Sequence, residues 1–111
     1  MHKIIAVVLL GLSCSLAVAK TVLIDVRTPE EFAAGHIEGA LNIDYQVIGQ
    51  RIGMAGVAKD DEVVLYCRSG RRSSIALETL KGMGYKKLQN YGGMEDARKK
   101  ICSTGQKNKG C

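Results

Sequence analysis

The chain reads V-V-L-Y-C-R-S-G-R-R-S-S from Val63 to Ser74. The apolar, β-branched start of this stretch is typical of a buried strand, which ends at Cys67. A loop with one glycine and three arginines follows, and two serines then precede an amphipathic segment that we expect to be helical from Ile75 to about Met83. A strand, a tight loop and a helix N-terminus in this order aim backbone N–H groups and the positive end of a helix dipole at one point.

A thiol at that point is expected to ionise easily, because the N–H donors and the guanidinium groups stabilise the thiolate. We therefore predict that Cys67 is a nucleophile at the mouth of a pocket lined by main-chain donors and guanidinium charge. The alternative is a small core residue at the end of a buried strand. The neighbouring arginines favour the nucleophile, since burying their charge beside an inert thiol would cost on the order of several kcal/mol.

Strands and helices are predicted to alternate along the chain. We expect strands at 21–26, 41–43, 62–66 and 87–90, and helices at 29–34, 46–52, 75–83 and 94–101. Thr28 followed by Pro29 is a helix start signal, and Ser73 or Ser74 is the expected N-cap of the helix after Cys67. This alternation predicts an α/β fold, a single domain with a small parallel sheet and helices on both faces. Cys67 would then lie at the carboxyl end of a strand, where such sheets bind ligands.

The first nineteen residues read as a secretory signal peptide cleaved after Ala19. A basic start precedes the apolar run from Ile4 to Leu12, which is too short to span a membrane. Lipidation of Cys14 is the alternative, but Gly11 stands where a lipoprotein signal has a larger aliphatic residue. We expect a signal at 1–19, the folded domain at 20–101, a polar tail at 102–111, and a periplasmic or secreted product without membrane attachment.

Cysteine usage and charge narrow the function further. Residues 20–111 contain Cys67, Cys102 and Cys111, and export implies a compartment in which cysteines pair. A bridge between the two tail cysteines would leave Cys67 free, although they could also stay reduced or pair between chains. No C-x-x-C pair occurs and His36 is the only histidine of this part, so neither a metal site nor another cofactor is expected. The net charge of +5 without basic–aromatic alternation favours small anions over nucleic acid as partners.

Three blocks of sequence follow one another along the chain. They are I-D-V-R-T-P-E-E-F at 24–32 continuing through G-H-I-E-G-A-L-N-I at 35–43, Y-C-R-S-G-R-R-S at 66–73, and Y-G-G-M at 91–94. In their order and spacing the chain resembles the rhodanese-like sulfurtransferases, and in particular their small exported single-domain members. The resemblance covers nearly all of residues 20–101 and leaves residues 102–111 outside.

The resemblance implies a thiosulfate sulfurtransferase activity. Cys67 would take the outer sulfur of thiosulfate or a similar anionic donor as a persulfide and pass it to cyanide or a thiol. The backbone N–H groups from Arg68 through Ser69, Gly70 and Arg71 to Ser73 would cradle that sulfur, with Gly70 allowing the tight arc. Arg72 matches the arginine common in the family's loop, and Arg68 and Arg71 are candidates for binding the donor. We expect structural roles near the site for Asp25 and Arg27, as an ion pair, and for His36, as a hydrogen-bonded scaffold residue. Gly92 and Gly93 would let the backbone of the last strand turn sharply near the site.

Two other functions remain open from the sequence. A cysteine-dependent phosphatase also uses an arginine-rich loop, but Ser73 and Tyr66 stand where the tyrosine phosphatase signature has an arginine and usually a histidine. A persulfide carrier that delivers sulfur to a partner protein would use Cys67 in the same way, but it would turn over slowly with free thiosulfate and cyanide and would hold a stable persulfide on Cys67.

Overall fold

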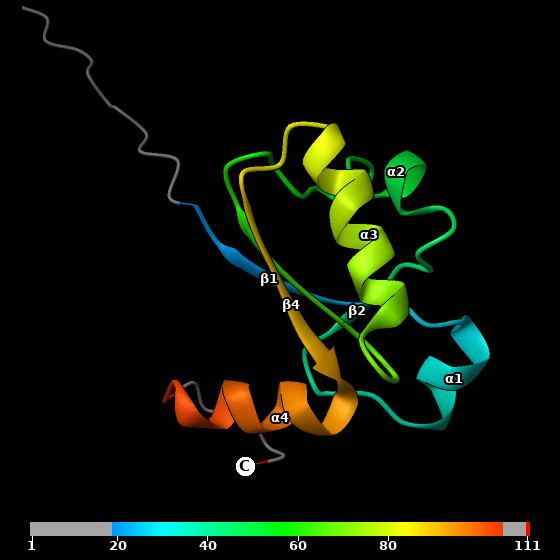
Figure 1. The fold of residues 1–111 in the computed structure, drawn as a ribbon, viewed down its shortest axis with the longest axis vertical. Coiled ribbons are helices and arrows are strands. Elements are labelled where there is room, and N and C mark those ends of the chain that lie inside the picture. The colour runs from blue at the N-terminus through cyan, green and yellow to red at the C-terminus, as the bar shows by residue number, and fades with distance from the viewer. Residues whose placement is uncertain (1–18, 106–110) are drawn as a thin grey trace, which may run out of the picture.

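The computed structural model describes residues 19–105 and residue 111. Within this part, parallel strands form one sheet in the order β2-β1-β3-β4 (Figure 1). The elements along the chain are β1 (Thr21–Asp25), α1 (Pro29–Ala34), β2 (Leu41–Asn42), α2 (Ile48–Arg51), β3 (Glu62–Cys67), α3 (Arg71–Gly82), β4 (Lys87–Gly93) and α4 (Met94–Ser103). The predicted α/β fold is confirmed.

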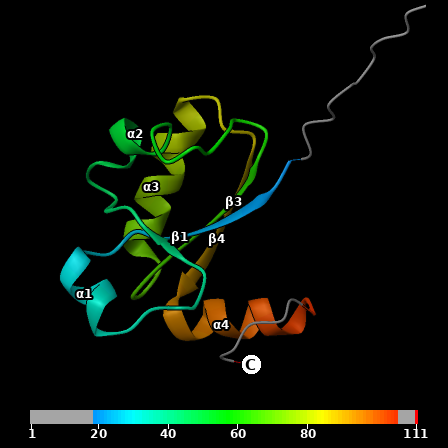
Figure 2. The same cartoon turned by 180° about the vertical axis from the view of Figure 1, so that it is seen from behind.

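Helices cover both faces of the sheet, with α2 and α3 on one side and α4 on the other (Figures 1 and 2). Alternation along β3 supplies both cores. Leu65 and Cys67 belong to the larger apolar cluster beneath α2 and α3, whereas Tyr66 packs with Ala97 and Ile101 of α4. This period of two follows from the opposite directions of successive side chains in a strand, and it places Cys67 on the α3 side.

The start of α1 follows from the sequence as expected. The Thr28 hydroxyl accepts a hydrogen bond from the Glu31 N–H, and the Glu31 carboxylate accepts one from the Thr28 N–H, which completes a capping box. Pro29 occupies the first helical position, where its missing N–H costs nothing.

The start of α3 differs from the prediction. The helix begins at Arg71 rather than near Ile75, and neither Ser73 nor Ser74 caps it. Gly70 precedes the first helical residue with φ +99°, a left-handed conformation that side chains disfavour. The chain therefore turns into the helix earlier than its apolar periodicity indicates, and Ser73 lies inside the first turn with its hydroxyl directed at the loop.

The two ends of the chain carry the predicted signal peptide and the two tail cysteines. The predicted signal peptide and Cys14 lie outside the described residues, apart from Ala19. Among the helices that are described, none is long and apolar enough to cross a membrane. Cys102 at the end of α4 forms a disulfide with Cys111, so the intramolecular bridge is the alternative that the structure contains, and Cys67 is a free thiol.

Candidate active site

The Cys67 sulfur is the point on which the loop between β3 and α3 converges. The Gly70 N–H donates to Sγ at 2.9 Å and the Ser73 N–H donates at 3.4 Å. The Ser73 hydroxyl lies 3.5 Å from the same sulfur. The loop therefore curls around the end of β3 and aims the first turn of α3 at the thiol, as a cradle for a negatively charged sulfur requires.

Three glycines allow this curl. Gly70 packs against the backbone of Gly92, where an added Cβ would lie 3.3 Å from the Gly92 Cα. At Gly93 an added Cβ would lie 2.5 Å from the Arg68 carbonyl oxygen, a distance that backbone atoms cannot accommodate. Gly93 pairs with Cys67 across a register shift at the ends of β3 and β4. The glycine pair of β4 therefore sets how closely the cysteine loop lies against the sheet.

The cradle shifts the ionisation of Cys67. Burial acts to raise the pKa of the thiol, because a charged sulfur loses its hydration. The Ser73 hydroxyl and the N–H groups of Ser73, Gly70 and Ser69 act in the opposite direction, and together they outweigh burial and lower the pKa. The hydrogen bonds of the loop, rather than a neighbouring base, favour the thiolate.

The burial of Cys67 corrects the expected placement at a pocket mouth. The residue is 0% exposed, and it contributes to the apolar cluster beneath α3. The sulfur is buried because the loop closes directly on it, as the short contact with the Gly70 N–H shows. One side of the side chain thus faces apolar core and the other faces polar N–H and hydroxyl groups.

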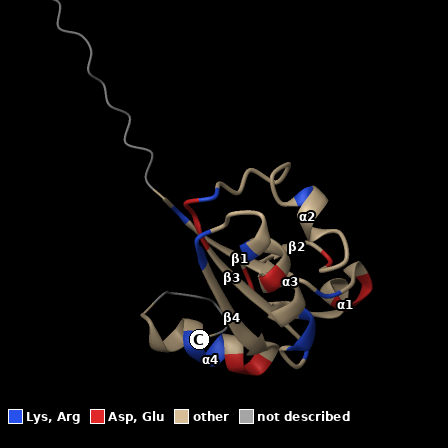
Figure 3. Cartoon of the chain, turned by 45° about the horizontal axis from the view of Figure 1, so that its top comes forward, with Lys and Arg blue, Asp and Glu red and all other residues tan. Residues whose placement is uncertain are grey.

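The three arginines of the loop have different surroundings. Arg72 is tied to α1, since its two Nη atoms donate to the two Glu31 carboxylate oxygens at 2.8 and 3.0 Å. Arg68 is 78% exposed in its side chain and approaches Glu31 to 3.7 Å. Arg71 is exposed at the first position of α3. Figure 3 shows the acidic turn of α1 (red) beside the basic loop (blue). Arg68 and Arg71 are therefore open to solvent, whereas the guanidinium of Arg72 is bound by Glu31.

The predicted pair of Asp25, at the end of β1, and Arg27, two residues later, is present and buried. Arg27 donates from Nε and Nη2 to the Asp25 carboxylate, with a shortest distance of 2.7 Å, and Nη2 also donates to the Gly35 carbonyl. The pair thereby anchors the end of α1. His36 is exposed, hydrogen-bonds the Phe32 carbonyl at 2.8 Å through Nδ1 and stacks on the Phe32 ring. Both arrangements support the fold around the site.

Three hydrogen bonds meet at Asn90, a residue that the sequence motifs do not mark as part of the site. Its side chain contacts the Ser73 hydroxyl, the Gly70 carbonyl and the Gly92 N–H. The sequence Asn90-Tyr91-Gly92 is a turn signal, and in the structure Gly92 adopts φ +85°. The connection of Asn90 to the cysteine loop was not available in the sequence, because that contact joins β4 to α3.

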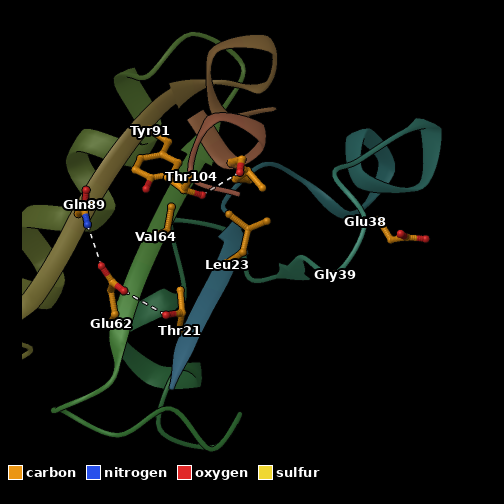
Figure 4. A pocket seen from close by; sticks show the side chains of 10 residues that line it. Thr21, Leu23, Glu38, Gly39, Glu62, Val64, Gln89, Tyr91 and Thr104 are labelled. Carbon is orange, nitrogen blue, oxygen red and sulfur yellow. Dashed lines mark hydrogen bonds between the residues drawn. The ribbon is translucent and has the colours of Figure 1, made fainter. Parts of the chain in front are cut away.

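A cleft of about 460 Å³ lies away from the cysteine loop, on the α4 side of the sheet (Figure 4). Leu23, Val64 and Tyr91 contribute apolar side chains to it, and Glu62 accepts hydrogen bonds from Thr21 and Gln89 along one side. Cys67 does not line this cleft. Within the described residues, no three His, Cys, Asp or Glu side chains gather closely enough to hold a metal ion.

Comparison with known proteins gives a consistent result. Residues 14–100 match the sequence profile described as a rhodanese-like domain. The chain is 44% identical over 73 residues to thiosulfate sulfurtransferase PspE of Escherichia coli, a match that covers 66% of this chain and 70% of that protein. It is also 44% identical over 71 residues to a sulfurtransferase of Allochromatium vinosum, covering 64% of each. Among solved structures, a rhodanese with anions from E. coli superposes with a TM-score of 0.66 at 42% identity, covering 68% of this chain and 89% of that one.

Proposed function

The chain belongs to the rhodanese family, and from that premise we propose that Cys67 is its nucleophile for moving a sulfane sulfur from thiosulfate or a similar anionic donor to cyanide or a thiol. The observation that carries this proposal is the convergence of the Gly70 and Ser73 N–H groups on the Cys67 sulfur. These donors favour the thiolate, which is the reactive form of cysteine.

In the first half-reaction the loop that encloses the Cys67 sulfur must first open, and the thiolate then attacks the outer sulfur of the donor. A bond forms between Sγ and that sulfur, while the sulfur–sulfur bond of thiosulfate breaks and sulfite leaves with the electron pair. The product is a persulfide on Cys67. We propose that the N–H groups of the same loop also stabilise the persulfide, whose negative charge lies on the outer sulfur next to Sγ.

In the second half-reaction the acceptor attacks the outer sulfur of the persulfide. With cyanide, a carbon–sulfur bond forms, the bond to Sγ breaks, and its electron pair returns to Cys67 as the thiolate. Thiocyanate leaves, and the enzyme is ready for another donor. Neither half-reaction requires a metal or an organic cofactor.

We assign the anionic group of the donor to Arg68 and Arg71. Both side chains are exposed beside the cysteine loop, where they can move to meet a small anion. Arg72 has a positioning role instead, because Glu31 already occupies its guanidinium through two hydrogen bonds. Ser69 and Gly70 contribute through their backbone.

The N-terminal sequence and the disulfide support a proposal about where the protein acts. We propose that residues 1–19 are a signal peptide and that the domain from residue 20 onward acts in the periplasm or is secreted. The bridge between Cys102 and Cys111 supports this proposal, because disulfides persist in oxidising compartments.

A persulfide carrier remains the second candidate, and the burial of Cys67 favours it. A sulfur enclosed by its loop is shielded from small reductants, so its persulfide would last until a partner protein opened the loop. A carrier would turn over slowly with free thiosulfate and cyanide and would hold a stable persulfide on Cys67.

The deciding experiment measures thiocyanate formation from thiosulfate and cyanide by residues 20–111. We expect turnover by the parent chain, none above background for Cys67→Ser, and retained turnover for the matched Cys102→Ser/Cys111→Ser variant. Turnover by Cys67→Ser would disprove the assignment of the nucleophile. A parent chain that binds sulfur without releasing it to cyanide would establish the carrier.

A further inference from the structure

Asn90, in the middle of β4, connects three parts of the cysteine cradle. Its Oδ1 lies 2.7 Å from the Ser73 hydroxyl oxygen and 2.8 Å from the Gly92 nitrogen. Its Nδ2 lies 3.1 Å from the Gly70 carbonyl oxygen. The side chain is partly buried, so these contacts are held in place by the packing of β4 against the loop.

The chemistry of these partners fixes the orientation of the amide. A backbone N–H can only donate, so the atom facing Gly92 must be the amide oxygen. A backbone carbonyl can only accept, so the atom facing Gly70 must be the amide nitrogen. It follows that Ser73 meets an acceptor in Asn90, and its hydroxyl is the donor in the 2.7 Å hydrogen bond.

Ser73 has one hydroxyl proton and several acceptors within reach. The Gly70 carbonyl, 3.1 Å away, already accepts from the Ser74 N–H and from the Asn90 amide, which occupies both of its lone pairs. The remaining acceptors are Asn90 Oδ1 and the Cys67 sulfur, 3.5 Å from the hydroxyl oxygen. While the Ser73 hydroxyl donates its hydrogen bond to Asn90, the hydrogen bond between Ser73 and the sulfur must be donated by the Cys67 thiol.

We propose that Asn90 is a positioning residue that competes with the Cys67 sulfur for the single hydroxyl proton of Ser73. In the thiol form the proton of Ser73 points to Asn90, and the S–H group donates to the serine oxygen. When the thiol ionises, rotation about the Ser73 Cβ–Oγ bond turns the hydroxyl toward the thiolate without moving a heavy atom. Asn90 Oδ1 keeps its hydrogen bond from Gly92, so this exchange leaves no buried acceptor without a partner.

Other charged groups near the sulfur also affect its ionisation. On α3 the Arg72 guanidinium interacts electrostatically with Cys67, and Glu31 of α1 pairs with that guanidinium. Tyr45, from the segment after β2, packs against the same apolar cluster and also interacts with Arg72. From the β4 side Asn90, Gly92 and Gly93 contact the cradle, and none of the three is charged. A change at Asn90 therefore alters hydrogen bonding at the site without removing a charge.

The inference deepens the proposed function, since it concerns the thiolate on which sulfur transfer would depend. Its test measures ionisation of Cys67 in the absence of any sulfur donor or acceptor. The readouts are the ultraviolet absorbance of the thiolate against pH, corrected with Cys67→Ser, and the pH dependence of alkylation by iodoacetamide. Failure of sulfur transfer would leave these readouts unaffected, so the two proposals can fail separately.

We expect Asn90→Leu to release the Ser73 proton to the sulfur and to lower the thiol pKa by about half a pH unit, which raises alkylation about threefold below the midpoint. Ser73→Ala should raise the thiol pKa, because the thiolate loses a donor. In the Ser73→Ala background, Asn90→Leu should have no further effect. Asn42→Leu is the matched control, because Asn42 also donates to backbone carbonyls at a strand end but bonds Asp25 and Arg27, and it should leave the thiol pKa unchanged.

A rise in the thiol pKa of Asn90→Leu, or an equal change with and without Ser73, would show that Asn90 only braces the loop and would overturn the proposal. Asn90→Asp keeps the shape and the acceptor and provides a second test if the leucine variant does not fold. Its carboxylate should hold the serine proton more tightly and raise the thiol pKa. That rise should shrink in the Ser73→Ala background, and a rise of the same size there would contradict the competition.

Discussion

The carboxylate of Glu31 on α1 holds the guanidinium of Arg72 on α3 through two hydrogen bonds, of 2.8 and 3.0 Å, between residues 41 positions apart. The same carboxylate completes the capping box of α1. The hydrogen bonds from Arg72, which have the largest effect, and from the Thr28 N–H lower the pKa of Glu31 to about 2. One side chain thereby joins the start of α1 to the helix that carries the cysteine cradle.

Glu31→Gln should lower the free energy of unfolding by about 1 kcal/mol at neutral pH, because a bidentate, half-buried ion pair is lost. The folded-state pKa lies below the ordinary value of 4.5, so the contribution of the carboxylate is complete above pH 4.5 and is lost as the pH falls toward 2. Urea unfolding at neutral pH and at pH values in this window measures the effect. Glu30→Gln, at an exposed position on the same turn, is the control and should change stability little. If the difference in free energy of unfolding between Glu31→Gln and the parent grew as the pH fell, this account would be contradicted.

Gly93→Ala should destabilise the domain by about 1–3 kcal/mol and reduce sulfur transfer, because the new Cβ would displace the Arg68 carbonyl and with it the cysteine loop. Thermal unfolding and thiocyanate formation measure the two effects. Gly53→Ala provides the comparison, since an added Cβ there meets nothing within 4 Å and the backbone φ is not positive. Equal behaviour of the two variants would mean that the close approach of β4 does not shape the loop.

Arg68→Ala and Arg71→Ala should each raise the KM for thiosulfate about threefold to tenfold and leave kcat nearly unchanged, because exposed guanidinium groups contribute to binding of the anion. Lys81→Ala removes an equal charge from the far end of α3 and should leave the KM unchanged. A loss of kcat without a change in KM would place these arginines in the chemical step instead.

The Cys102–Cys111 disulfide should stabilise the chain by about 2–3 kcal/mol, because it closes a short loop in the unfolded state. Thermal unfolding of Cys102→Ser/Cys111→Ser against the parent tests this value. Activity at moderate temperature should persist in that variant, since the bridge lies at the end of α4 and the cradle is built from β3, β4 and α3. A loss of thiolate reactivity on removal of the bridge would show that the tail acts on the site.

Local signals predicted most of the fold, as the start of α1 illustrates. Thr28, Pro29 and Glu31 interact within one turn, so neighbouring residues suffice to place this helix. The parallel sheet and the position of Cys67 at a strand end also followed from the alternation of apolar runs. The start of α3 did not, because the left-handed conformation of Gly70 depends on the loop packing against Gly92.

Long-range contacts explain what the sequence could not predict about the site. The bonds between Arg72 and Glu31 and between Asn90 and Ser73 connect separate elements, and no local pattern encodes either. The burial of Cys67 likewise depends on how far the loop closes over β3. The chemistry of the loop could therefore be predicted from its residues, whereas the partners that position it required the three-dimensional arrangement.

The central claim is that Cys67 carries sulfur, and intact-mass spectrometry of residues 20–111 after brief exposure to thiosulfate tests it most directly. We predict a gain of one sulfur atom, located at Cys67 by peptide mapping, absent from Cys67→Ser and removed by cyanide as thiocyanate forms. An unchanged mass in the parent chain, or the same gain in Cys67→Ser, would contradict the claim.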